Sequence, residues 1–172
     1  PDVILLGEIR SQETMEFALS FAETGHLCMA TLHANNANQA IERILHLVPV
    51  EKHRQLLYDL SFNLKAIVAQ QLIPTRDGQG RRAAFELLIS TPLVKDILLK
   101  GEMHRLKEVM AKSREQGMMT FDQSLFDLYR QGVIGYNEAL AYADSANDVR
   151  LMIKLDGGVS PDAGMLNNVT ID

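Results

Sequence analysis

The sequence predicts an α/β domain with a largely parallel sheet and an antiparallel hairpin, followed by a small helical bundle. Two observations carry this prediction. Residues 1–33 show the pattern of a strand, a helix and a second strand, which form a right-handed βαβ unit. After about residue 90, by contrast, the apolar residues recur only at helical spacing. We therefore expect an α/β part over 1–90, a helical part over 91–155 and a disordered tail over 156–172.

Two continuous apolar runs are the predicted parallel strands. Val3–Leu6 and Leu27–Leu32 carry apolar side chains at successive positions, as central strands covered on both faces do. Between them, Ser11–Glu23 has apolar residues at i, i+3, i+4 and i+7, which predicts a helix with one buried stripe. Gly25 ends this helix, because glycine adopts the left-handed conformation common after a helix.

The later elements are predicted from turn and capping residues. Residues 76–80 carry an aspartate and glycines that favour a turn between two strands of a hairpin. Thr91 and Thr120 are suited to cap helices, the second through a capping box with Gln123. The predicted strands are 66–73 and 83–89, and the predicted helices are 37–47, about 51–60, one from Pro92, 103–114, 121–132, one from Asn137 and one from Ser145.

Composition limits the class of protein. Of the 172 residues, 47% are hydrophobic and 23% charged, which suits a chain with a buried core. The net charge of −5 argues against nucleic acid as a partner. No run approaches the roughly 18 apolar residues of a transmembrane helix. The single cysteine, Cys28, lies in an apolar run and predicts a small buried residue, with no disulfide or zinc framework.

The candidate site consists of side chains that follow the two predicted strands. Glu8 comes after the first strand and His33 after the second, and ligands of open α/β sheets bind beyond these carboxyl ends. A carboxylate there can hold a hydrated Mg²⁺ or orient a water beside a γ-phosphate. His33 can hydrogen-bond a phosphate. The alternatives are an ion pair of Glu8 with Arg10 and a helix cap by His33.

His26 stands at the opposite end of the second strand. A separation of roughly 20 Å prevents it from sharing one metal or one phosphate with His33 in the same subunit. This predicts a structural role for His26, and a role across a subunit boundary stays open. Arg10 and Arg43 are candidates for phosphate binding, because a guanidinium binds phosphate through two hydrogen bonds. Arg10 could equally pair with Glu13.

These residues carry a family resemblance. Pro1–Arg10 resembles the Walker B signature of the secretion ATPase superfamily, which includes type II secretion and type IV pilus motors. Ala22–His33 resembles the histidine box of the same superfamily, and both motifs stand in its order and spacing. The chain departs from the signature at Ser11, where the family usually has Asp. The resemblance implies that this chain forms the C-terminal half of a RecA-like ATPase core.

The resemblance also implies the roles of the site residues. Glu8, His33 and His26 would be catalytic, and Gly7, Glu8, Arg10 and His33 would contact the nucleotide. The implied cofactors are ATP and Mg²⁺, with the metal bound at Glu8 through water. No G-x-x-x-x-G-K-[ST] loop, the Walker A phosphate loop, occurs in the sequence, and the chain starts with Pro-Asp and not with Met. We therefore expect a fragment that is inactive alone.

Other residues favour the retraction branch of the superfamily, the PilT/PilU type. Assembly-type members usually carry a four-cysteine zinc module, whereas here Gln70–Pro74 runs directly into a short turn and Cys28 is the only cysteine. Gly117–Asp122 resembles retraction ATPases, and Phe121–Leu155 is most similar to PilU.

The resemblance implies a function for the whole protein. It would be a homo-hexameric type IV pilus retraction ATPase, cytoplasmic and peripheral at the inner membrane, that couples ATP hydrolysis to pilus disassembly and twitching motility. Its partners would be an inner-membrane pilus platform protein and a PilT-type motor. Two alternatives stay open. One is an ATPase of the assembly or secretion branch (GspE/PilB type), and the other is an accessory interaction subunit of a PilT-type motor that docks through 91–155.

Overall fold

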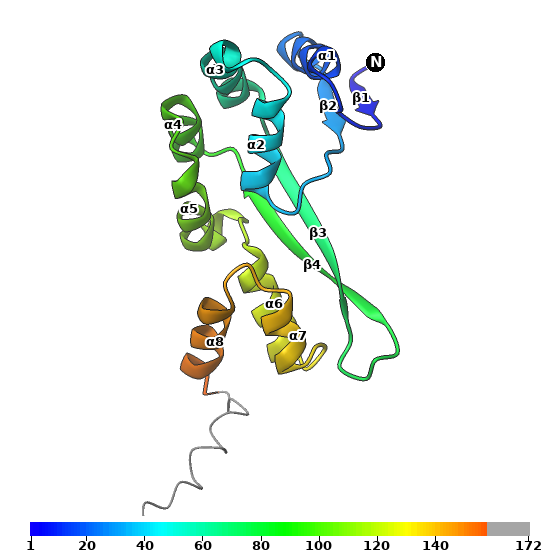
Figure 1. Cartoon of the computed structure of the whole chain (residues 1–172), viewed down its shortest axis with the longest axis vertical. Coiled ribbons are helices and arrows are strands. Elements are labelled where there is room, and N and C mark those ends of the chain that lie inside the picture. The colour runs from blue at the N-terminus through cyan, green and yellow to red at the C-terminus, as the bar shows by residue number, and fades with distance from the viewer. Residues whose placement is uncertain (158–172) are drawn as a thin grey trace, which may run out of the picture. The chain divides into compact units, whose positions relative to one another are not determined.

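The structure, a computed structural model, describes residues 1–157 (Figure 1). The expected disordered tail over 156–172 lies, from residue 158 on, outside the described residues. The chain divides into two compact units. The first comprises Pro1–Gln70 and Glu86–Met119, and the second comprises Gln71–Phe85 and the residues from Thr120 on. The predicted boundary at residue 90 separates an α/β sequence pattern from a helical one. It stays a prediction, because the boundaries between the compact units fall at other residues.

The predicted βαβ unit opens the first compact unit. Strands β1 (Val3–Leu6) and β2 (Leu27–Ala30) are parallel, with a register that runs from Val3 opposite Leu27 to Leu6 opposite Ala30. Helix α1 (Gln12–Glu23) connects them, and its first turn is capped by Ser11, whose Oγ accepts the amide of Thr14 at 3.3 Å. Serine therefore starts this helix where the family usually has Asp.

The expectation that both faces of these strands are covered is wrong for the described residues. Successive side chains of a strand point to opposite faces. One face carries Leu6 and Cys28, which pack against the core that α1 lines. The other face has no covering element within residues 1–157, so its apolar side chains are exposed. These are Val3, Leu5, Leu27 and Met29.

Helix α2 (Ala37–His46) contributes to two hydrophobic clusters of the first unit. Its residues Ala37 and Ile41 belong to a cluster with β4, α4 and α5. Ile44 belongs to a second cluster that α1 and α3 complete. The other helical elements of this unit are η1 (Val50–Lys52), α3 (His53–Asn63), α4 (Pro92–Lys100), η2 (Met103–Arg105), α5 (Leu106–Lys112) and η3 (Arg114–Gln116). The buried residues of α2 lie on one side of the helix, and their packing against two clusters fixes the helix in this unit.

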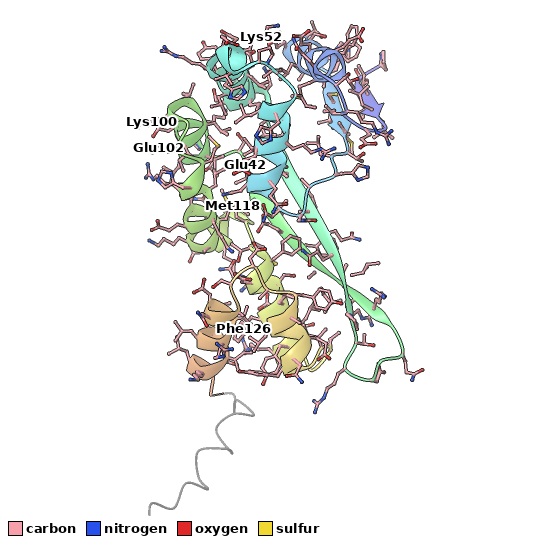
Figure 2. The ribbon with its side chains drawn as sticks, in the orientation of Figure 1. Glu42, Lys52, Lys100, Glu102, Met118 and Phe126 are labelled. Carbon is pink, nitrogen blue, oxygen red and sulfur yellow. The ribbon has the colours of Figure 1, made fainter. Side chains whose placement is uncertain are left out.

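Some side chains of the first unit are buried in its core and others are exposed to solvent; Figure 2 labels Met118 and Lys100 as examples. Met118 is buried in the cluster of α2, β4, α4 and α5, whereas Lys100 lies exposed at the end of α4. Thr91 and Pro92 start α4 as predicted, with the Thr91 hydroxyl accepting the amide of Val94. The predicted helix 103–114 is replaced by η2, α5 and η3, which are three shorter helical segments.

The predicted hairpin and capping box are confirmed. Strands β3 (Ala66–Pro74) and β4 (Arg81–Ile89) form a two-stranded sheet. Its turn is closed by the amide of Thr75, which donates to the carbonyl of Gly80 at 3.0 Å.

Within the described residues, the second unit contains three helices after its part of the hairpin. The first of them, α6, starts with the capping box of Thr120 and Gln123. The buried core residues of this unit include Phe121, Leu125, Ile134, Ala139, Val149 and Ile153. Its helices are α6 (Phe121–Arg130), α7 (Tyr136–Ala141) and α8 (Ala146–Leu155).

A buried carboxylate connects two helices of the second unit. Asp122, in the first turn of α6, accepts the amide of Asp144 at 2.8 Å and the amide of Ser145 at 3.2 Å. Ser145 is the predicted N-cap of α8. Among residues 1–157, no helix has both the length and the apolar character needed to cross a bilayer.

Substitution of two adjacent leucines tests the core of the first unit. Leu98 is fully buried and Leu99 is 46% exposed on the same helix. Leu98→Ala leaves a cavity, so we expect it to lower the free energy of unfolding by about 3 kcal/mol. Leu99→Ala is the control and should lower it by less than about 1 kcal/mol. Urea unfolding measures both, and equal losses would contradict the described packing of α4.

Candidate functional site

Glu8 and His33 meet at the edge of the sheet where β1 and β2 end. The strands are in register, so their carboxyl ends lie side by side. The pairing continues past the strands, because the amide of Ile9 donates to the carbonyl of Thr31 at 3.0 Å. The Nε2 atom of His33 then lies 2.9 Å from Oε1 of Glu8. This confirms the prediction that the two side chains come together at this edge of the sheet.

The carboxylate of Glu8 is the least accessible group of the site. Its side chain is 15% exposed, whereas the side chains of Arg10 and His33 are 75% and 74% exposed. Oε2 accepts a hydrogen bond from Nε of Arg10, so the ion pair that the alternative predicted is also present, and Arg10 pairs with Glu8 and not with Glu13. Oε1 is shielded from solvent and accepts no hydrogen bond within residues 1–157. The imidazole of His33 lies close to it, but the ring is not oriented to donate a hydrogen bond to this oxygen. The carboxylate is thus oriented and keeps one acceptor.

The backbone at Gly7 is open to a ligand. The hydroxyl of Thr31 donates to the carbonyl of Gly7, which ties the two strand ends together. A Cβ atom placed on Gly7 would meet no atom within 4 Å. A bulky group can therefore approach the backbone just before Glu8.

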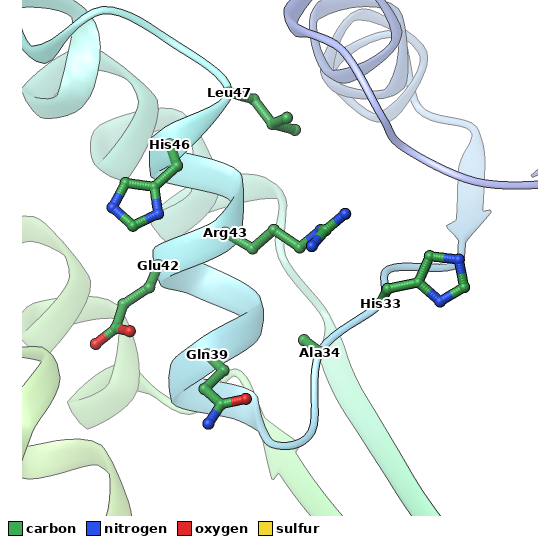
Figure 3. A pocket seen from close by; sticks show the side chains of 7 residues that line it. All are labelled: His33, Ala34, Gln39, Glu42, Arg43, His46 and Leu47. Atoms are coloured by element: carbon green, nitrogen blue, oxygen red, sulfur yellow. The ribbon is translucent and has the colours of Figure 1, made fainter.

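A pocket of about 380 Å³ opens beside His33 (Figure 3). Arg43 extends from α2 toward the segment that carries His33, whereas Glu42 points away from it. The side chain of Arg43 makes no hydrogen bond or ion pair within the described part of the chain. The lining residues are His33, Ala34, Gln39, Glu42, Arg43, His46 and Leu47. An unpaired guanidinium next to an imidazole can bind an anion.

The sequence predicted only part of this pocket. Arg43 was a candidate, whereas Gln39 and His46 were not. Gln39, Arg43 and His46 recur at helical intervals of four and three residues, which places them on one side of α2. That spacing was the available signal, but polar residues at such intervals also mark a helix face that is merely solvated.

His26 is not brought to this edge. It precedes β2, whereas His33 follows it, so the two histidines stand at opposite ends of the strand as predicted. Its Nδ1 atom lies 3.1 Å from the hydroxyl of Thr24 and 3.2 Å from the carbonyl of Phe21. Its ring also packs edge-on against Phe21. Within one copy of the chain, His26 therefore stabilises the end of α1.

The acidic, histidine and cysteine side chains of the described residues do not form a self-sufficient metal centre. Within residues 1–157, no three of them are grouped in an arrangement that could hold an ion. Glu8 can supply one carboxylate to a metal whose other ligands come from elsewhere. Cys28 is half-buried in β2, and burial raises the pKa of its thiol above the ordinary value. It packs against the core that α1 lines, but it is only partly buried, whereas the sequence predicted a buried residue.

Comparison with known proteins gives a consistent result. The family model described as "Type II/IV secretion system protein" matches residues 1–131. The type IV pilus ATPase PilU of Pseudomonas aeruginosa is 64% identical over 170 residues, which cover 99% of this chain and 44% of that protein. A twitching motility protein of Neisseria gonorrhoeae is 38% identical over 149 residues, which cover 87% of this chain and 40% of that protein. The chain thus spans less than half the length of these relatives.

A solved structure extends the likeness to the fold. The crystal structure of the pilus retraction motor PilT with bound ADP matches with a TM-score of 0.78 and 36% identity. The match covers 88% of this chain and 42% of that one. It confirms the predicted fold class, which is the C-terminal half of a RecA-like ATPase core followed by helices.

The two histidines should differ in their effect on stability. We expect His26→Ala to lower the free energy of unfolding by about 1 kcal/mol, because it removes the polar and ring contacts at the end of α1. His33→Ala should change it by less than about 0.5 kcal/mol, because that side chain is exposed. Urea unfolding of both variants tests this. A loss for His33→Ala as large as that for His26→Ala would contradict the described contacts.

Proposed function

The chain belongs to the Type II/IV secretion system protein family, and from this premise we propose that it is the C-terminal half of the ATPase domain of a type IV pilus retraction motor. The observation that carries the proposal is the placement of Glu8 and His33, 2.9 Å apart, at the carboxyl edge of two parallel strands. The likeness to PilU over 99% of the chain, helical end included, supports the retraction branch.

Glu8 is the proposed hydrolytic residue. Its shielded oxygen accepts a hydrogen bond from the attacking water and aligns it with the γ-phosphorus of ATP. The water oxygen forms the new bond to phosphorus while the bond between phosphorus and the β-phosphate oxygen breaks. The proton that the water loses passes through Glu8 to the released phosphate, so ADP and inorganic phosphate result. His33, beside Glu8, donates a hydrogen bond to a γ-phosphate oxygen and stabilises the charge that spreads there.

The open backbone at Gly7 and the guanidinium groups of Arg10 and Arg43 are the proposed phosphate contacts. Gly7 leaves room for the nucleotide beside the strand end. Arg43 is unpaired and Arg10 is exposed, so both can reach phosphate oxygens.

Glu8 also fits a magnesium site. Mg²⁺ prefers carboxylate oxygens and keeps several water ligands, and Glu8 offers a carboxylate oxygen that accepts no hydrogen bond within residues 1–157. We propose that Glu8 holds the ion through water. When bound, Mg²⁺ neutralises negative charge on the β- and γ-phosphates.

The proposal extends to the assembly. We propose a ring of six subunits that works at the cytoplasmic side of the inner membrane with a pilus platform protein and a PilT-type motor, and that drives pilus disassembly and twitching motility. The names of the relatives, a pilus ATPase and a twitching motility protein, support this setting. In such a ring His26 would act on a site shared with a neighbouring subunit, since it is separated from Glu8 by the length of β2.

Loss of the Glu8 carboxylate should abolish hydrolysis. In the full-length protein, we expect Glu8→Gln to lower the rate of ATP hydrolysis about 100-fold or more, because the carboxylate that orients and activates water is lost. ATP binding should be retained, because Glu8 holds Mg²⁺ only through water and the phosphate contacts of Gly7, Arg10 and Arg43 are unchanged. Glu13→Gln, at an exposed carboxylate on the first turn of α1, is the matched control and should hydrolyse ATP normally. A steady-state phosphate-release assay measures the rates. Normal turnover by Glu8→Gln would make that carboxylate structural and favour the accessory-subunit alternative.

The described chain alone should bind ATP poorly. It contains no phosphate loop, so the backbone amides that cradle the β- and γ-phosphates in such enzymes are not supplied by these residues. Calorimetric titration of the 172-residue chain with ATP and Mg²⁺ tests this. Micromolar affinity would contradict the assignment of the chain to the half without that loop.

A further inference from the structure

A buried carboxylate on the hairpin has no part in the hydrolytic step. Glu86, on β4, is 3% exposed. Its Oε1 atom accepts the amide of Ala37 at 2.8 Å, across 49 residues of sequence. Ala37 is fully buried, so water cannot reach this amide. The contact therefore gives a buried donor its partner and a buried carboxylate a compensating hydrogen bond.

The contact lies at the positive end of α2. The first amides of a helix have no partner inside the helix, and together they attract negative charge. The side chain of Asn36 accepts one of them, the amide of Gln39, at 2.9 Å. Glu86 accepts another, the amide of Ala37. Two side chains from different parts of the chain thus share the capping of this helix, and the charged one is held by β4.

The same contact anchors the segment that carries His33. On the strand side, the carbonyl of Thr31 is held by the amide of Ile9 at 3.0 Å. On the helix side, Ala37 is held by Glu86. His33 lies between these two anchors, and its own backbone makes no hydrogen bond within residues 1–157. Its position relative to Glu8 therefore depends on the two ends of the segment.

We propose that Glu86 is a positioning residue of the ATPase site, whose buried carboxylate fixes the first turn of α2 and thereby holds His33 opposite Glu8. The inference rests on the proposed function of these two residues. Without the carboxylate, the buried amide of Ala37 loses its partner, so the first turn shifts toward water and the His33 segment moves with it. The proposed phosphate contact at Gly7 follows β1 and is not affected.

The kinetic test uses the full-length protein with Glu86→Ala and Glu86→Gln. A displaced His33 weakens stabilisation of the transition state and leaves nucleotide binding intact, so Glu86→Ala should lower kcat about 10- to 100-fold at unchanged KM for ATP. Glu86→Gln should restore most of kcat, because its amide oxygen still accepts the Ala37 amide. Hydrogen exchange followed by mass spectrometry should show faster exchange over residues 34–38 in Glu86→Ala than in Glu86→Gln.

Asp122 provides a matched control. Its carboxylate is equally buried and also accepts backbone amides, those of Asp144 and Ser145, but it does so in the second compact unit. Asp122→Ala and Asp122→Asn should lower thermal stability and speed exchange around residue 145, with kcat unchanged. If Glu86→Ala does not fold, Glu86→Asp takes its place, because its shorter side chain draws the carboxylate away from the Ala37 amide, and a lower kcat in Glu86→Asp than in Glu86→Gln supports positioning, whereas equal kcat in the two variants overturns it.

The outcomes separate the two proposals. Wild-type kcat in Glu86→Ala, together with loss of turnover in Glu8→Gln, would overturn the positioning role and leave the proposed function standing. An equal fall of kcat in the Glu86 and Asp122 variants would reduce Glu86 to a stability residue and also overturn it. Normal turnover in Glu8→Gln would overturn both proposals.

Discussion

The in-register pairing of β1 and β2 is the constraint on which the site depends. Because Leu6 lies opposite Ala30, both strands end at the same level and the residues after them emerge side by side. A shift by one residue would turn the side chains that follow each strand to opposite faces. The amide of Ile9 and the hydroxyl of Thr31 extend the pairing beyond the strands, so the edge is fixed where Glu8 and His33 leave it.

Helix α2 connects the segment after β2 to the hydrophobic core of the first unit. Its apolar residues are buried in two separate clusters, which leaves the helix little freedom to rotate. Its first turn is held by Glu86 of β4 and by the side-chain amide of Asn38, which donates to the carbonyl of Met103 at 3.2 Å. The exposed side of the helix, with Arg43, can therefore present a defined surface to the pocket beside His33. Burial on one side fixes the polar groups on the other.

The parts of the fold that follow from neighbouring residues were predictable from the sequence. Apolar runs, the Thr91 and Thr120 caps and the turn after β3 depend on short-range chemistry, and the structure confirms them. The pairing of Glu8 with His33 was predictable because parallel strands align their ends. Glu86 was not, since a glutamate within an alternating strand pattern gives no sign of the distant amide that it serves. Nor could apolar content reveal that one face of β1 and β2 is exposed in residues 1–157.

The site combines a fixed carboxylate with replaceable partners. Glu8 is largely buried at the end of a paired strand, whereas the side chains of Arg10 and His33 are mostly in solvent. Ion pairs with exposed partners are worth about 0–1 kcal/mol, because water competes for both groups. Under the proposed function, a nucleotide phosphate, with its higher charge, would therefore draw Arg10 to itself while Glu8 stays in place. This difference in burial would allow the Glu8 carboxylate to be paired with Arg10 before the proposed nucleotide binds and to be available to water afterwards.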